Sequence, residues 1–275
     1  MKFFNYIALL LCIVFFSCEE QPVEIPKFIV EEGNRKVMIE EFTGVSCAPC
    51  FDGAAAIEDI VKSYPGRAIV NGIHGVFQAN PTSESKYDFR YDDAAALENS
   101  TFLIGKPSAL IDRVQFEDQD FLAIDDRDSW KSKVVERLAI PSPVTLSATS
   151  SYDEGTRTAT ISISVQALED LPGIIKLFAI VNESELVDPQ LSNSMGLVID
   201  FTHKHVMKDM LTTITGDIIG EDIDAGEVLP RTFTYTVPGE VNGEWIPENM
   251  EVACFVTAAG LNDEVLQAEA VHLTE

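Results

Sequence analysis

The chain has 275 residues, and its 45 acidic residues against 19 basic ones give a formal net charge of −26 at pH 7. This charge argues against a nucleic-acid-binding protein, because nothing is available to neutralise phosphates, and equally against adhesion to anionic lipid headgroups. The acidic residues are scattered along the sequence, which indicates a solvated surface rather than one acidic tail.

Residues 1–17 have the pattern of a lipoprotein signal peptide. Lys2 supplies a positive start, and the apolar run over residues 6–16 is too short to span a membrane. A small residue followed by cysteine, Ser17-Cys18, then looks like a lipobox. This pattern predicts cleavage before Cys18, thioether lipidation of Cys18 and a polar tether over residues 18–27. The alternative is an ordinary secreted protein with an incidental cysteine.

Export places the mature chain in a compartment that permits disulfides, and this simplifies the assignment of its five cysteines. Cys12 leaves with the signal peptide and Cys18 is lipidated. Cys47 and Cys50 are expected to pair. Cys254 is left over, and because it alternates with valines in an apolar run we expect a buried small hydrophobe.

The segment Cys47-Ala48-Pro49-Cys50 lies between a predicted strand at residues 37–42 and a predicted helix at 52–63. The partial positive charge at a helix N-terminus favours a thiolate over a thiol. Cys47 is therefore expected to be an exposed nucleophile, and Cys50 would resolve the mixed disulfide. The alternative is a closed disulfide that only staples the turn. Zinc is disfavoured, because the sequence has no second Cys/His pair at a suitable spacing.

The rest of the first half predicts a mixed α/β domain. A strand at residues 68–73 would complete a parallel strand–helix–strand unit with the first strand. The elements expected after it are an irregular polar insertion at 76–93, a short helix at 93–99, a strand at 108–112 with a hairpin partner at 114–116, and a helix at 129–138 capped by Ser129.

Pro141 and Pro143 mark a linker, and the chain beyond them reads almost entirely as strand. Alternating apolar residues predict strands at 157–165, 175–181, 232–237, 251–257 and 265–271. Residues 183–227 are less regular. The predicted fold is an α/β domain over residues 28–140, followed by an all-β immunoglobulin-like sandwich over residues 144–275, each with its own core.

Three histidines are candidates for a functional role. His74 follows the strand at 68–73, whose end would lie near the dithiol, and a protonated His74 would lower the pKa of Cys47. The alternative is a loop histidine in a tight turn. His203 and His205 would point the same way on a strand, but a metal site would need further ligands, so a structural role is favoured.

The first half resembles the thioredoxin-like superfamily over residues 28–140. The strand, the Cys-Ala-Pro-Cys segment and the helix carry one part of the resemblance, and Gly-Lys-Pro-Ser at 105–108 carries the other. The resemblance implies a cis peptide bond before Pro107, which would face the dithiol and present a strand-like edge to an extended substrate. It also implies that Glu41 is the buried acid beneath the dithiol, relaying a proton to or from Cys50. The alternative for Glu41 is an exposed carboxylate at the sheet edge.

The whole chain is more specifically similar to the lipoprotein family related to the twenty-eight-kilodalton outer-membrane protein of Bacteroidota. The stretches that carry this similarity are Ile-Glu-Glu-Phe-Thr-Gly at 39–44, Gly-Lys-Pro-Ser-Ala-Leu-Ile-Asp-Arg at 105–113 and His-Lys-His-Val-Met-Lys at 203–208. The resemblance implies an outer-membrane lipoprotein, facing the periplasm or the cell surface, with a thioredoxin-like domain and a β-rich C-terminal domain.

Two functions are compatible with these features. The first is a membrane-anchored thiol–disulfide oxidoreductase that acts on protein thiols or disulfides, with Cys47, Cys50, Pro107, Glu41 and His74 at its site and with neither a diffusible cofactor nor a metal. The second is a non-enzymatic surface lipoprotein that binds proteins or glycans and uses the disulfide as a staple. An exposed Cys47 would favour the first. A buried sulfur pair, with an apolar patch on the sandwich, would favour the second.

Overall fold

The computed structural model describes residues 33–239, 243, 245–260 and 263–274. The predicted signal peptide, the lipidation site at Cys18 and the tether over residues 18–27 lie outside these ranges. Within them, no helix is both long and apolar enough to cross a membrane.

Three strands form the centre of the first half. β1 (Val37–Phe42) and β2 (Ala68–Ile73) pair in parallel along their whole length, and β3 (Ser108–Ile111) pairs antiparallel with β1. Every residue of the three strands is buried, because structure covers both faces of this part of the sheet. The predicted parallel pair of β1 and β2 is confirmed.

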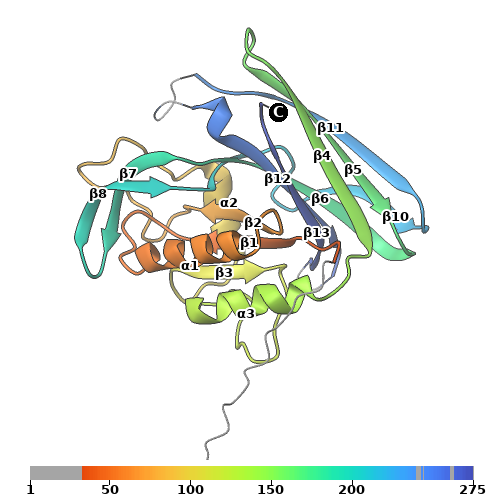
Figure 1. The fold of residues 1–275 in the computed structure, drawn as a ribbon, viewed down its shortest axis with the longest axis horizontal. Helices are drawn as coiled ribbons and strands as arrows, with labels where there is room; N and C mark the ends of the chain where they lie inside the picture. The colour runs from red at the N-terminus through yellow and green to blue at the C-terminus, as the bar shows by residue number, and fades with distance from the viewer. Residues whose placement is uncertain (1–32, 240–242, 244, 261–262, 275) are drawn as a thin grey trace, which may run out of the picture.

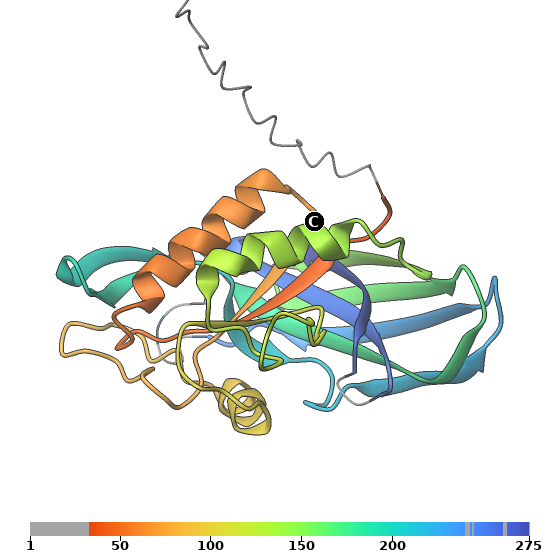
Figure 2. The same cartoon turned by 90° about the horizontal axis from the view of Figure 1, so that it is seen from below.

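Helices cover both faces of these strands. α1 (Cys50–Ser63) and α3 (Arg127–Leu138) lie on one face, and α2 (Asp92–Ser100) lies on the other (Figure 2). The predicted cap of α3 is wrong: the helix begins two residues earlier, because the carboxylate of Asp126 accepts a hydrogen bond from the backbone N–H of Asp128. Ser129 lies inside the helix instead.

The predicted hairpin partner at residues 114–116 is also wrong. Asp112 and Arg113 both adopt left-handed backbone conformations, with φ of 49° and 53°, so the chain turns out of the sheet directly after β3. Ala109 of β3 forms its bridge with Ile124 instead, just before α3. The apolar residues at 114–116 only pack against the core as a loop.

Strands dominate the second half, as expected. In chain order they are β4 (Val144–Asp153), β5 (Thr158–Ala167), β6 (Leu171–Glu183), β7 (Leu186–Ser192), β8 (Gly196–His203), β9 (Val206–Met210), β10 (Asp217–Ile223), β11 (Val228–Thr236), β12 (Met250–Ala258) and β13 (Val265–His272), with a short 3-10 helix at Pro247–Asn249. The segment at 183–227 that the sequence left irregular contains β7 to β10.

One sheet runs through both halves of the chain (Figure 1). Its order is β13-β12-β6-β9-β2-β1-β3, and β10 pairs with β6 outside this path. The junction is the parallel contact of β9 with β2, where the backbone N–H of Gly72 donates to the carbonyl of His205 at 2.7 Å. A Cβ atom at position 72 would lie 3.0 Å from that carbonyl oxygen, so glycine permits this close approach.

Each half has a buried cluster of its own, as expected, but a third cluster is shared between them. The shared cluster contains Met38 and Phe42 of β1 together with Phe178 of β6 and Phe255 of β12. The second layer, β11-β5-β4, packs on the other side of β6 and β12 to give a two-layer β region. This region is not a free-standing immunoglobulin-like sandwich, because one of its layers continues into the first half. The division of the chain near residues 141–143 stays a prediction.

A buried ion pair reinforces the junction. The guanidinium of Arg113 forms two hydrogen bonds of 2.7 Å with the carboxylate of Glu40, and both side chains are largely buried. The same guanidinium lies 4.4 Å from the ring centroid of Phe178 and 4.9 Å from that of Phe255. Arg113 thus joins β1 of the first half to two strands of the second by charge and by cation–π contact.

Replacing Arg113 with alanine is expected to lower the free energy of unfolding by about 3–5 kcal/mol, because the carboxylate of Glu40 would be left buried and unpaired. Urea unfolding followed by circular dichroism measures this loss. The matched control is Arg127→Ala, which removes an exposed 3.5 Å contact with Asp52. The control should cost less than about 1 kcal/mol. Similar losses in the two variants would contradict a joining role for Arg113.

Candidate functional site

Cys47 and Cys50 form a disulfide with 5.3 Å between their Cα atoms. The expected exposure of Cys47 is wrong, because Cys47 is 0% and Cys50 1% exposed. The pair lies where predicted, between β1 and α1. A segment from the second half of the chain, which sequence reasoning did not connect with the disulfide, lies against the disulfide loop.

The segment that lies against the disulfide loop is the hairpin of β7 and β8. The side-chain amide of Gln190 in β7 donates to the carbonyl of Gly44 at 3.2 Å and to the carbonyl of Cys47 at 3.0 Å. The backbone N–H of Leu191 donates to the carbonyl of Val45 at 3.0 Å. In β8, the ring of Phe201 lies 5.4 Å from that of Phe51, the residue after Cys50.

Glu41 lies on the side of β1 that faces α1, and its carboxyl group is buried. The side chain is 6% exposed, and its Oε1 atom has no hydrogen-bond partner among the described residues. Burial without a compensating charge raises the pKa of Glu41 to about 8. The alternative of an exposed carboxylate is therefore wrong, and the acid is protonated at neutral pH.

Pro107 approaches the same part of α1. The Lys106–Pro107 peptide bond is cis, as the thioredoxin resemblance implies. A Cβ atom at Gly53 would lie 2.8 Å from the Cβ of Pro107 and 3.3 Å from the Oε1 of Glu41, so only glycine lets the helix lie this close to both. Lys106 fixes the loop: its Nζ donates to the carbonyl of Thr43 at 2.8 Å and pairs with Glu98 at 2.6 Å.

His74 is buried, and the role expected for it is wrong. Burial holds its pKa well below the usual value, and the neighbouring His203 and Lys106 lower it further. The imidazole is therefore neutral and supplies no positive charge that would lower the pKa of Cys47. Its ring lies 5.9 Å from that of His203, and the ring of Phe89 contacts both histidines.

His203 and His205 do not point the same way. β8 ends at His203, whose pKa burial lowers to about 4, so this imidazole is also neutral. His205 has a left-handed backbone with φ of 52°, and its Nδ1 lies 3.0 Å from a carboxylate oxygen of Glu251. Among the residues that the structure describes, no group of three or more His, Cys, Asp or Glu side chains is placed to hold a metal ion.

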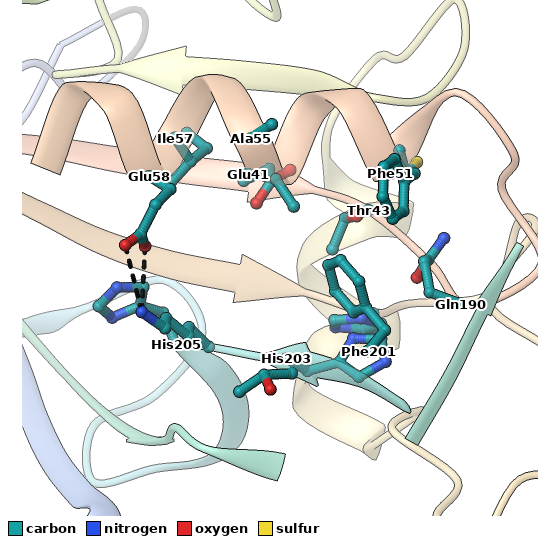
Figure 3. A pocket seen from close by; sticks show the side chains of 15 residues that line it. Glu41, Thr43, Phe51, Ala55, Ile57, Glu58, Gln190, Phe201, His203 and His205 are labelled. Carbon is teal, nitrogen blue, oxygen red and sulfur yellow. Dashed lines mark hydrogen bonds and ion pairs between the residues drawn. The ribbon is translucent and has the colours of Figure 1, made fainter. Parts of the chain in front are cut away.

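A cleft of about 320 Å³ lies between α1 and β8. Its inner wall includes Cys50, Glu41 and His74. Figure 3 shows Phe201 pointing toward Phe51 at one end and a charged contact of Glu58 at the other; this contact is the ion pair of Glu58 with Lys204 at 3.2 Å. The wall of the cleft therefore includes Cys50 of the disulfide, the protonated carboxyl group of Glu41 and the neutral imidazoles of His74 and His203.

Gln190, Phe201 and the position of His203 are the parts of this site that sequence reasoning missed. The alternation of Leu197, Ile199, Phe201 and His203 would have indicated a strand. No local signal predicts that this strand lies over α1, because the contact joins residues about 150 positions apart.

Because the pKa of Glu41 is raised, this residue is expected to destabilise the fold as pH rises. Below about pH 4.5 both folded and unfolded states are protonated, and above this pH only the unfolded state releases its proton until the folded state titrates near pH 8. Glu41→Gln should therefore match the wild type near pH 4.5 and exceed its free energy of unfolding by roughly 4–5 kcal/mol above pH 8.

Urea unfolding of both proteins between pH 4.5 and pH 8.5 measures this difference. The titrations of His74 and His203 cancel in the comparison, because both proteins contain them. A difference that does not change with pH would mean that the carboxyl of Glu41 titrates at its ordinary pKa.

The chain is similar to known proteins in both sequence and structure. A stretch of 92 residues is 30% identical to thioredoxin of Buchnera aphidicola subsp. Baizongia pistaciae (strain Bp), covering 34% of this chain and 81% of that thioredoxin. The structure is similar to HBP35 of Porphyromonas gingivalis, with a TM-score of 0.68 and 18% identity over 88% of this chain and 76% of that one.

A protein of Agrobacterium tumefaciens, AGR_C_4864, also has this fold, with a TM-score of 0.51 and 11% identity over 88% of this chain and 96% of that one. At these identities the structural matches show the fold alone. The family model of outer membrane protein Omp28 matches residues 94–275, which include Pro107, the β7–β8 hairpin and the strands of the second half. The chain therefore belongs to the Omp28 family of outer membrane proteins.

Proposed function

We propose that this protein exchanges thiols and disulfides with other proteins of the cell envelope through Cys47 and Cys50. The observation that carries the proposal is the buried carboxyl group of Glu41 in the cleft that Cys50 lines, because its Oε1 atom has no hydrogen-bond partner in the described part of the chain. Burying such a group without a partner costs stability. A disulfide that only staples a turn has no use for a proton donor, whereas the opening of a disulfide releases a thiolate that needs one.

The reaction follows from this arrangement. A thiolate of a partner dithiol attacks the sulfur of Cys47, a mixed disulfide forms, and the bond between Cys47 and Cys50 breaks. The electron pair of that bond leaves with Cys50, and the Cys50 thiolate takes the proton of Glu41. The second partner thiolate then attacks the partner's sulfur in the mixed disulfide and releases Cys47 as a thiolate. Two electrons pass from the partner dithiol to this protein, and the reverse sequence oxidises a partner.

Two further features support the exchange reaction. α1 begins at Cys50, so the partial positive charge of its N-terminus stabilises thiolates at the pair. Pro107 lies against the same turn of α1 as Glu41 and would present its backbone to an extended partner segment. The 30% identity of 92 residues to a thioredoxin also supports the exchange reaction.

The location in the outer membrane determines how the protein is anchored and which partners it can reach. We propose that Cys18 carries the lipid anchor and that residues 18–27 hold the folded part away from the membrane. The net charge of −26 suits this arrangement, because a strongly acidic domain is repelled by anionic headgroups. The partners would be envelope proteins with accessible thiols or disulfides.

A non-enzymatic binding protein is the second candidate, and the burial of both sulfurs favours it. An exposed aromatic pair lies in the first half and not on the sandwich, where the apolar patch is expected: Phe102 is 69% exposed, and its ring lies 5.3 Å from that of Phe121. In this candidate function the disulfide only holds the turn before α1.

Glu41→Gln is expected to slow the reduction of the disulfide by a reduced thioredoxin at least about tenfold at pH 7, because the Cys50 thiolate loses its proton donor. The rate is measured on the full chain in detergent micelles by trapping and counting free thiols. The ratio of wild-type to variant rates should shrink toward one above pH 8, where Glu41 has itself lost its proton.

The matched control is Asp59→Asn, which removes an exposed carboxylate of α1 that pairs with Lys131. This variant should react at the wild-type rate. The contrary result is that reduced thioredoxin reduces the disulfide of the urea-unfolded chain but not that of the native protein. That result would contradict the exchange reaction and favour the binding function.

A further inference from the structure

The β7–β8 hairpin is a separate unit of the fold. It forms its own two-stranded sheet and pairs with no strand of the large sheet among the described residues. Figure 1 shows it extending beyond the large sheet, on the side where α1 lies. Its two roots are Glu185, with φ of 60°, and His205, with φ of 52°. Left-handed backbone at non-glycine residues is uncommon, and here it turns the chain out of the sheet at one root and back into it at the other.

The hairpin is anchored in part away from the disulfide. The carboxylate of Asp188 accepts a hydrogen bond from the backbone N–H of Lys86 at 2.7 Å. The ring of His203 contacts those of His74 and Phe89.

Against the disulfide the hairpin is held by the hydrogen bonds of Gln190 and Leu191 to the loop of Cys47, the ring contact of Phe201 with Phe51, and the ion pair of Lys204 with Glu58. Both partners of this ion pair are partly exposed, so it contributes little. A cleft of about 320 Å³ separates β8 from α1, so the close packing of the hairpin is made by β7, where Asp188, Gln190 and Ser192 are buried.

The hairpin also contacts the turn that contains the sulfurs. Gln190 is itself buried, and its single amide nitrogen reaches the carbonyls of Gly44 and Cys47 in that turn and of Leu191 within β7. The bonds to Gly44 and Cys47 join the hairpin directly to the turn of the first cysteine. Movement of β7 away from this turn would break both bonds together.

We propose that the β7–β8 hairpin is a flap that opens to admit a partner thiol, and that Gln190 is the positioning residue that holds it closed. The proposal rests on the proposed exchange reaction, whose rate the flap would limit. In the closed form neither sulfur is open to attack. In the open form Phe51 and Phe201 separate, and the disulfide lies at the mouth of the cleft.

The test is the rate at which the small phosphine reductant TCEP reduces the disulfide of the full chain in detergent micelles. Gln190→Ala and Phe201→Ala should each raise this rate about tenfold, since each removes contacts made only by the closed flap. The matched control is Ile199→Ala, which truncates an exposed side chain of β8, the strand that contains Phe201. Its rate should stay within about twofold of the wild type.

The dependence of the rate on urea separates flap opening from unfolding. Local opening exposes little surface, so the reduction rate should change only weakly at urea concentrations below the unfolding transition. At high TCEP concentration the wild-type rate should also level off at the rate of opening. Two results together would overturn the flap: a wild-type reduction rate that depends on urea as strongly as global unfolding does, and the same reduction rate in Gln190→Ala.

The flap and the exchange reaction fail in different ways. Fast reduction by thioredoxin that is the same in wild type, Gln190→Ala and Phe201→Ala would overturn the flap and leave the exchange reaction standing. Fast reduction by TCEP in the two variants, without any reduction by thioredoxin, would support the flap and overturn the exchange reaction.

Discussion

The close approach of β9 to β2 at Gly72 is the contact on which the rest of this structure depends. Position 72 has no side chain, so the carbonyl of His205 reaches its backbone N–H at 2.7 Å. This contact carries the strands of the second half into the sheet of the first. Because β6 and β9 are both fixed in that sheet, the hairpin between them has its place set over α1 and the disulfide. A Cβ atom at position 72 would lie 3.0 Å from the carbonyl oxygen of His205, so a side chain would force β9 to shift relative to β2.

One physical cause explains the shifted pKa values of Glu41, His74 and His203 at the covered site. Burial disfavours the charged form of each, so the pKa of Glu41 rises while those of His74 and His203 fall. The two cysteines at the same site are 0% and 1% exposed. The shifted pKa values and the burial of the disulfide therefore depend on structure outside the dithiol segment, including α1, Pro107 and the β7–β8 hairpin.

The chemistry-bearing residues could be identified from the sequence because they lie in local patterns. The paired cysteines between a strand and a helix, the acid in that strand and the proline before β3 all occupy the places that the thioredoxin resemblance implies. The wrong predictions concern what lies around them. The hairpin partner at 114–116 has suitable apolar residues, but two left-handed residues after β3 turn the chain away. The charge expected on His74 is absent, because His203 and Phe89 bury it from distant parts of the chain.

The sequence by itself determined the strand–helix–strand unit and the pairing of Cys47 with Cys50, because hydrophobic periodicity and residue spacing act over short distances along the chain. The family followed from the resemblance of the stretches at 39–44, 105–113 and 203–208. Only the tertiary structure decided that the two halves share a sheet and a core, and that Gln190 and Phe201 close the site. These outcomes depend on contacts between residues more than a hundred positions apart. Such contacts are set by which surfaces fit together once the strands have formed, and no local pattern in the sequence records them.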